Sequence, residues 1–239
     1  MRPLGVIACL LAVATASAAS AEVVTIPPER DNTLFQDADG DTSNGAGPAF
    51  FAGNNGQNLT RRALLAFDLA AQVPAGSKVD SVVLTLQISS APDTFSRRFT
   101  LHRVLANWGE GQSYSSGGAG APATPGDATW LHTFYPDQLW AHAGGDFEPA
   151  ASASELVGDV GRYVWTGAGM TADVQTWLGQ PASNFGWLIQ GEEIGPRTVR
   201  RFDSRESDLA ANRPALTIYF SATVPSRSMS WGSLKSRYR

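Results

Sequence analysis

The sequence predicts an all-β protein, a jelly-roll-like antiparallel β-sandwich with one short helix and long loops. Apolar and polar residues alternate over several short segments, which is the period of a half-buried strand. Glycine and proline separate these segments, as in Pro74-Ala75-Gly76 and Gly195-Pro196, and such pairs favour turns. Helical periodicity is nearly absent. Many short strands joined by turns are typical of a sandwich.

Six strands are expected, at residues 62–69, 78–89, 98–105, 185–190, 198–203 and 215–220. The clearest is 78–89, in which one face is predicted to carry Val82, Leu84, Leu86 and Ile88. In 98–105, the residues expected to point inward are Phe99, Leu101 and Leu105, and those expected to point outward are Arg98, Thr100 and His102. Each inward set has the period of two that places side chains on one face of a sheet.

One helix is predicted at residues 172–178, with Thr171 as its N-cap and Asp173 in its first turn. Its apolar face comprises Val174, Trp177 and Leu178. Residues 107–161 show little alternation and are expected to form long irregular loops. Loops of this length in a compact domain tend to be functional or disordered.

The N-terminus has the pattern of a secretory signal peptide, assigned to residues 1–21. Arg2 precedes an apolar run at 4–13, and small residues lead to Ala21, with Ala18 as the alternative cleavage position. The run is shorter than the ~20 residues that a membrane-spanning helix needs, so no transmembrane segment is expected after cleavage. Cleavage would remove Cys9, the single cysteine. The expected product is secreted, extracellular or in the cell envelope, and has no disulfide.

Charge divides the rest of the chain into an acidic domain, residues 22–220, and a basic tail, residues 221–239. The domain carries all 22 acidic residues against 13 basic ones, and the tail carries only basic charges. A net acidic domain argues against a nucleic-acid partner, because phosphate binding depends on clustered lysine and arginine. No second core or internal repeat is visible, so 22–220 is expected to be one β-sandwich domain. The tail is expected to be disordered, or to touch an anionic surface.

An ordered series of short motifs runs through the domain. Its members include Asp31-Asn32-Thr33-Leu34, Arg61-Arg62-Ala63-Leu64-Leu65-Ala66-Phe67-Asp68, Trp108-Gly109-Glu110-Gly111 and Arg201-Phe202-Asp203-Ser204-Arg205-Glu206. The series resembles the DNRLRE-type domains, which are similar to the family 96 carbohydrate-binding modules. The resemblance implies an exported bacterial jelly-roll domain of the kind appended to polysaccharide-degrading or surface proteins.

A glycine-containing loop offers candidate calcium ligands, namely Asp37, Asp39, Asp41 and Asn44. Alternate oxygen donors in a tight loop suit Ca²⁺, which takes six to eight oxygens. The expected role of the metal is structural. The same residues are equally typical of a turn that links two strands without any metal.

Two further sets are candidates for ligand binding. Trp140, in a loop beside His142 and Asp146, is the best candidate for an exposed aromatic platform, whereas Trp177 and Trp187 are expected in the core. The other set contains Arg200 and Arg205, whose guanidinium groups are suited to an acidic polysaccharide. The alternative for the arginines is ion pairing, with Asp68 or Glu110 as possible partners.

Catalytic motifs are missing from the sequence. It has no nucleophile elbow, no zinc-protease motif and no phosphate loop, and its three histidines occur outside any motif. A Glu110–Asp146 pair carries no information, since 22 acidic residues always allow some pair. The chain is therefore expected not to be an enzyme. The leading hypothesis is a carbohydrate-binding protein whose partner is a polysaccharide or surface glycan. A structural envelope or matrix protein and a polysaccharide lyase or hydrolase are the alternatives.

Overall fold

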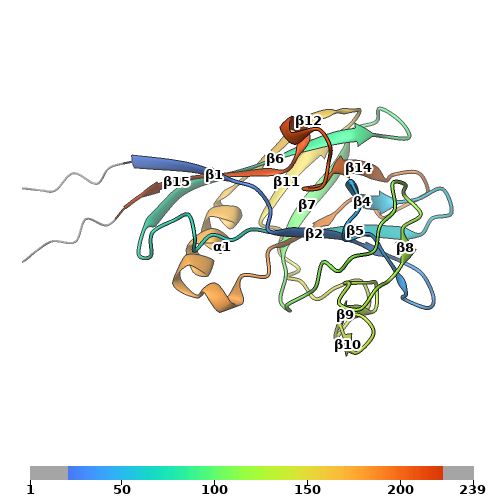
Figure 1. Cartoon of the computed structure of the whole chain (residues 1–239). Helices are drawn as coiled ribbons and strands as arrows, with labels where there is room; N and C mark the ends of the chain where they lie inside the picture. The colour runs from blue at the N-terminus through green and yellow to red at the C-terminus, as the bar shows by residue number, and fades with distance from the viewer. Residues whose placement is uncertain (1–20, 223–239) are drawn as a thin grey trace, which may run out of the picture.

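The computed structural model describes residues 21–222, and its strand pairings are antiparallel throughout (Figure 1). One curled sheet of 11 strands folds into two facing halves. The first half contains β12 (Gly161–Thr166), β6 (Lys78–Ser90), β15 (Ala215–Ser221), β1 (Ala21–Ile26), β14 (Arg200–Asp203) and β4 (Ala49–Asn54). The second contains β2 (Arg30–Phe35), β5 (Thr60–Ala66), β13 (Trp187–Gln190), β7 (Arg97–Arg103) and β11 (Ala153–Val157). The predicted all-β sandwich is confirmed.

Smaller elements complete the described chain. They are the strand pairs β3 (Thr42–Ser43) with β8 (Ala121–Pro122) and β9 (His132–Phe134) with β10 (Gln138–Leu139), the helix α1 (Ala168–Gly179), and the 3₁₀ turns η1 (Pro181–Ser183) and η2 (Ala210–Asn212). Both small pairs belong to the region between β7 and β11 or contact it. This region therefore has more order than the sequence predicts.

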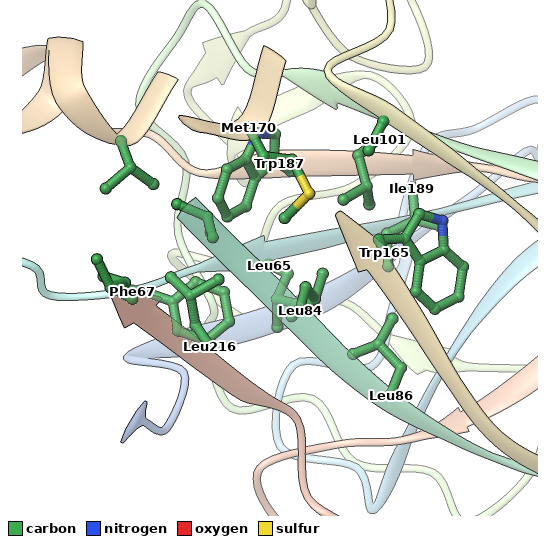
Figure 2. Close-up of a cluster of buried hydrophobic side chains, with 14 of the residues drawn as sticks. Leu65, Phe67, Leu84, Leu86, Leu101, Trp165, Met170, Trp187, Ile189 and Leu216 are labelled. Atoms are coloured by element: carbon green, nitrogen blue, oxygen red, sulfur yellow. The ribbon is translucent and has the colours of Figure 1, made fainter. Parts of the chain in front are cut away.

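The main core fills the space between the two halves. Leu84 and Leu86 of β6 face Leu65 of β5 and Ile189 of β13, and all four are fully buried (Figure 2). The inward face predicted for residues 78–89 is thus confirmed. Each buried leucine or isoleucine side chain contributes roughly 1.5–3 kcal/mol through the apolar surface it removes from water.

The strand β4 belongs to both halves of the sheet. Its residues Ala49 to Ala52 pair with β14 in the first half, and Gly53 and Asn54 pair with β5 in the second. Gly53 lies at the change of direction with φ of +103°. This conformation favours glycine because a side chain there is sterically strained. The corner brings the ends of β4, β5 and β14 together at one end of the sandwich.

The helix differs from its prediction at the N-terminus. It begins at Ala168 after the N-cap Gly167, without a side-chain cap, and the Thr171 hydroxyl donates to the Gly167 carbonyl oxygen at 3.3 Å. Thr171 therefore lies inside the helix, and its role as N-cap was wrong. The predicted apolar face is correct, because α1 buries Val174, Trp177 and Leu178 together with Met170.

Strand β7 ends earlier than predicted, and the expected orientation is wrong for two residues of the predicted segment, Leu105 and His102. Phe99 and Leu101 are fully buried as expected, but Leu105 lies beyond the strand and is 48% exposed. His102, expected outward, is buried because its Nδ1 contacts the Glu148 carbonyl oxygen at 2.8 Å.

Within residues 21–222, no helix is long and apolar enough to cross a membrane. The signal peptide predicted at 1–21 lies outside the described residues except for Ala21, which opens β1 and pairs with Ser221. The basic tail predicted at 221–239 also lies outside them, apart from its first two residues.

Candidate functional site

A groove of about 740 Å³ lies against the loop formed by residues 140–147, here called the Trp140 loop. Its lining includes Arg62, Leu105, His142, Asp146, Phe147 and Pro149. The structure therefore brings His142 and Asp146, two of the predicted ligand-binding residues, into one groove. Leu105, Phe147 and Pro149 give the groove an apolar floor.

Asp146 shapes the Trp140 loop. Its carboxylate accepts hydrogen bonds from the backbone N–H groups of Ala141, at 2.7 Å, and His142, at 3.0 Å. The His142 Nδ1 lies 2.9 Å from the same carboxylate, while the side chain is 86% exposed. Gly144 and Gly145 have φ of +88° and +100° and allow the chain to reverse within two residues. The Asp146 carboxylate thus orients the imidazole of His142, which remains exposed to solvent.

Arg62, on β5, connects the loop to the sheet. Its Nε and Nη2 donate to the two carboxylate oxygens of Glu193 at 2.8 and 2.9 Å, and its Nη1 donates to the Gly144 carbonyl oxygen at 2.9 Å. The guanidinium also lies 5.1 Å from the Trp130 ring centre and 5.3 Å from that of Phe147. Glu193 balances the charge of Arg62, so the groove has little net charge on this side.

Trp140 does not reach the groove surface. It is 5% exposed, and its Nε1 donates to the Thr129 carbonyl oxygen at 2.9 Å. It belongs to a second apolar cluster on the outer face of β5 and β13, together with Leu34, Leu64, Trp108, Trp130 and Leu188. The exposed aromatic platform predicted for Trp140 was wrong, because the loop folds back over this cluster. The ring instead supports the Trp140 loop from beneath.

Arg200 is fully buried and does not face a ligand site as predicted. Its Nε donates to the Gly158 carbonyl oxygen at 2.7 Å, and its Nη2 donates to the Asp93 carboxylate at 3.0 Å and to the Phe95 carbonyl oxygen at 2.9 Å. Arg200 therefore joins the β6–β7 turn, the β11–β12 turn and β14. Its role in the described chain is to pair buried acceptors, which agrees with the alternative of ion pairing.

Arg205 lies at the centre of a cluster with Asp31, Glu110 and Glu206, here called the Arg205 cluster. Its Nε and Nη2 each donate to the Glu110 carboxylate at 2.7 Å, and its Nε lies 2.8 Å from Glu206. Ion pairing with Glu110 is confirmed. Asp68 is not a partner, because it is exposed and accepts from Ala71 in its own turn.

The Arg205 cluster joins three distant segments. The backbone N–H of Asp31 donates to Glu110 at 2.9 Å, and that of Arg205 donates to Asp31 at 2.9 Å. Burial, together with the nearby carboxylate of Glu206, raises the pKa of Asp31 well above its ordinary value. These three carboxylates are the one group of described acidic, histidine or cysteine residues close enough together to hold a cation. Two of these carboxylates, Glu110 and Glu206, are already paired with the guanidinium of Arg205.

The predicted calcium loop does not form a ligand set. Asp39 and Asp41 are exposed, and Asp37 accepts a hydrogen bond from the Gly40 N–H, as in a simple turn. Asn44 is buried and directed elsewhere, since its amide donates to the Ala49 carbonyl oxygen at 2.9 Å and accepts from the Ser115 N–H at 2.6 Å. The geometry fits the turn that was the alternative reading of this sequence, and it does not fit Ca²⁺.

Comparison with known proteins adds no family assignment. No protein-family model matches the sequence, and no curated protein matches it. Arg62, Leu105 and Phe147 were not predicted as site residues, and only the lining of the groove assigns them to the site. The position of Arg62 could have been predicted from the strand pattern. Alternation along β5 places it on the same face as Leu64, beneath the Trp140 loop.

Proposed function

We propose that this chain is an exported, non-catalytic carbohydrate-binding protein whose groove beside the Trp140 loop holds part of a polysaccharide or surface glycan. The observation that carries the proposal is the lining of the groove. An apolar floor of Leu105, Phe147 and Pro149 meets His142 and Asp146 on one side. Ligand sites are commonly mostly apolar with a few polar groups that fix orientation.

This arrangement matches the two faces of a sugar ring. The C–H face of a pyranose packs against an apolar floor, and its hydroxyl groups need donors and acceptors at the edge. His142 supplies an exposed imidazole with a free ring nitrogen, and Asp146 supplies carboxylate oxygens. The open form of the groove is suited to a chain that passes through it, more than to a fully enclosed small molecule.

The composition of the groove also supports a role without catalysis. Most glycoside hydrolases use two carboxyl groups that flank the scissile bond. The groove is lined by a single acidic residue, Asp146. Its two oxygens already accept hydrogen bonds from the backbone N–H groups of Ala141 and His142, so both oxygens help to hold the loop.

The test is a glycan array followed by titration calorimetry with three variants of the purified chain. His142→Ala removes the exposed imidazole, and Ala143→Trp fills the groove. Ala71→Trp is the matched control, because Ala71 is exposed and outside the groove lining. The first two variants are expected to weaken glycan binding at least about tenfold, as loss of one well-placed polar contact does. Ala71→Trp is expected to bind like the wild type.

A reducing-sugar assay on the same glycans separates the alternatives. Release of reducing ends by the wild type would contradict the non-catalytic role and favour a lyase or hydrolase. Glycan binding that survives both His142→Ala and Ala143→Trp would show that the groove is not the site. No binding to any glycan on the array would favour the structural envelope role.

A further inference from the structure

A second pocket, of about 310 Å³, lies where β4 and β5 meet at the corner of the sheet. Four separate segments form it: the β4–β5 turn with Asn55, the β6–β7 turn with Pro92, the glycine-rich stretch with Gly118, and the segment before β14 with Arg197. Figure 1 shows the β4–β5 turn at the end of the sandwich opposite the two ends of the described chain. We call this cavity the Arg61 pocket, after the most buried polar residue in its lining.

The Arg61 pocket is separate from the groove. Arg61 and Arg62 are consecutive in β5, so their side chains point to opposite faces of the sheet. Arg62 lines the groove and Arg61 lines the pocket. The two sites therefore lie on either side of one strand, and a ligand in one does not contact the other.

Arg61 is only 7% exposed, yet not all of its guanidinium N–H groups have a hydrogen-bond acceptor. Only Nη1 donates to described residues, to the carbonyl oxygens of Gln36 and Thr60 at 3.4 and 3.0 Å. Nε is enclosed without any partner. The side chain lies over the Phe35 ring at 4.8 Å. The charge of Asp37 acts on it, but no described carboxylate forms a hydrogen-bonded ion pair with it. Buried guanidinium groups are normally paired, because an unpaired charge is costly to bury.

Arg197 is the second cation of the pocket, and its backbone is unusual. Its φ is +61°, a conformation that is uncommon for residues other than glycine, asparagine and aspartate. Its N–H donates to the Asn55 carbonyl oxygen at 2.9 Å, which holds the segment against the β4–β5 turn. The exposed side chain makes no hydrogen bond or ion pair with a described residue. A residue held in an unfavourable conformation, whose side chain makes no structural contact, is a reason to look for function.

The remaining lining contains no acidic residue. Phe51, Pro92 and Val199 provide apolar walls, and Gly118 packs on the Phe51 ring, where an added Cβ would lie 3.3 Å from it. A cavity with two guanidinium groups and apolar walls excludes cations and offers little to a neutral hydroxyl compound. Guanidinium groups bind oxyanions through parallel N–H donors.

We propose that the Arg61 pocket binds an oxyanion, a carboxylate, sulfate or phosphate group, between the guanidinium groups of Arg61 and Arg197. The apolar walls then contact the part of the ligand that carries this group. A volume of about 310 Å³ is at the small end of ligand sites, so the pocket holds a single charged group with a small body. This site is separate from the proposed glycan groove, and the two proposals can be tested independently.

The experiment titrates the full chain with sodium sulfate, phosphate and acetate at constant ionic strength, followed by backbone amide NMR and thermal melting. The wild type is expected to show saturable shifts at the amides of Asn55, Gly56 and Arg197, and a rise in melting temperature from preferential binding to the folded state. Comparison of the three anions identifies whether a planar or a tetrahedral group binds better.

Arg197→Gly is the main variant, because glycine adopts φ of +61° without strain and the fold is preserved. It is expected to weaken oxyanion binding at least about tenfold, as loss of a charge-assisted donor does. Arg98→Gln is the matched control: Arg98 is exposed on β7, outside the pocket lining, and its loss changes the net charge equally. Arg197→Lys keeps the charge and is expected to restore part of the affinity.

Three results would overturn the proposal. Arg197→Gly that binds each anion like the wild type would show that the pocket is not the site. An equal loss in Arg98→Gln would show that only net charge matters. Linear shifts without saturation in the wild type would show general screening by salt.

Discussion

Arg205 donates both Nε and Nη2 to the carboxylate of Glu110, at 2.7 Å each. The two residues are 95 positions apart in sequence. The bidentate pair fixes the long segment after Trp108 against the exit of β14, and the Asp31 carboxylate joins β2 to the same point. This contact organises the region that the sequence leaves irregular.

Replacement of Arg205 by methionine is expected to destabilise the fold by about 2–3 kcal/mol, because Glu110 and Glu206 lose the guanidinium that pairs with them. The value lies below that of a fully buried pair, since Arg205 is 39% exposed and solvent screens part of its charge. Urea denaturation measures the change. Arg98→Met, at an exposed position, serves as the control and is expected to stay within about 0.5 kcal/mol of the wild type. Equal effects of the two variants would contradict a special role for the pair.

Stability is expected to fall as pH rises above about 4, the ordinary carboxyl pKa. Burial raises the pKa of Asp31, Glu206 and Asp127 in the folded protein. The folded state then retains protons that the unfolded state has released, so its advantage is complete below about pH 4 and is lost as pH passes the raised values. Urea denaturation at several pH values measures this, and Asp31→Asn is expected to flatten the dependence.

Asp93 provides the opposite case and the control. Hydrogen bonds from Arg97 lower the pKa of Asp93 to about 2. Its contribution is present above the ordinary value of about 3.9 and is lost as pH falls toward 2. Asp93→Asn is therefore expected to leave the slope between pH 5 and 8 unchanged. A wild-type stability that rises over this range would contradict the raised pKa values of Asp31, Glu206 and Asp127 in the folded protein.

The sequence predicts six of the 11 strands of the main sheet, and the reason is visible in β6. One face of β6 lies on the core while the other is partly open, so its apolar residues alternate with polar ones. The same signal fails for β4, whose six residues are all buried because the strand turns the corner between the two halves. It also fails for β2, where polar residues are buried: Asn32 donates to the Glu110 carbonyl oxygen at 2.9 Å and so replaces water.

The candidate site was only partly predictable. His142 and Asp146 are close in sequence and were predicted to lie in one loop, and the structure places both in the lining of one groove. The burial of Trp140 depends on a second cluster formed by residues from β2, β5 and β13, which no local pattern reveals. Likewise, the burial of Arg200 follows from carbonyl groups of two distant turns. Long-range contacts of this kind require the fold before they become visible.

Trp140→Ala is expected to destabilise the fold by about 3–5 kcal/mol, as truncation of a buried tryptophan does. The loss removes packing beneath the Trp140 loop and the hydrogen bond to Thr129. His142→Ala, two residues away and 86% exposed, is the matched comparison and is expected to change stability by less than about 0.5 kcal/mol. Thermal and urea melts of both variants measure the contrast. A Trp140→Ala protein as stable as the wild type would place the ring outside the second cluster.

The corner at Gly53 gives the sharpest test of the sheet topology. Alanine at this position must hold φ of +103°, and its Cβ would lie 2.9 Å from the carbonyl group of Thr198. The contact is with backbone, which cannot rotate away, so Gly53→Ala is expected to cost at least about 2 kcal/mol. Gly56, in the adjacent turn, is the control, because an added Cβ there meets nothing within 4 Å. Gly56→Ala is expected to be neutral, or to stabilise by up to about 1 kcal/mol by restricting the unfolded chain. Chemical denaturation of the two variants side by side decides the matter, because similar stabilities would mean that β4 passes between the two halves of the sheet at some other residue.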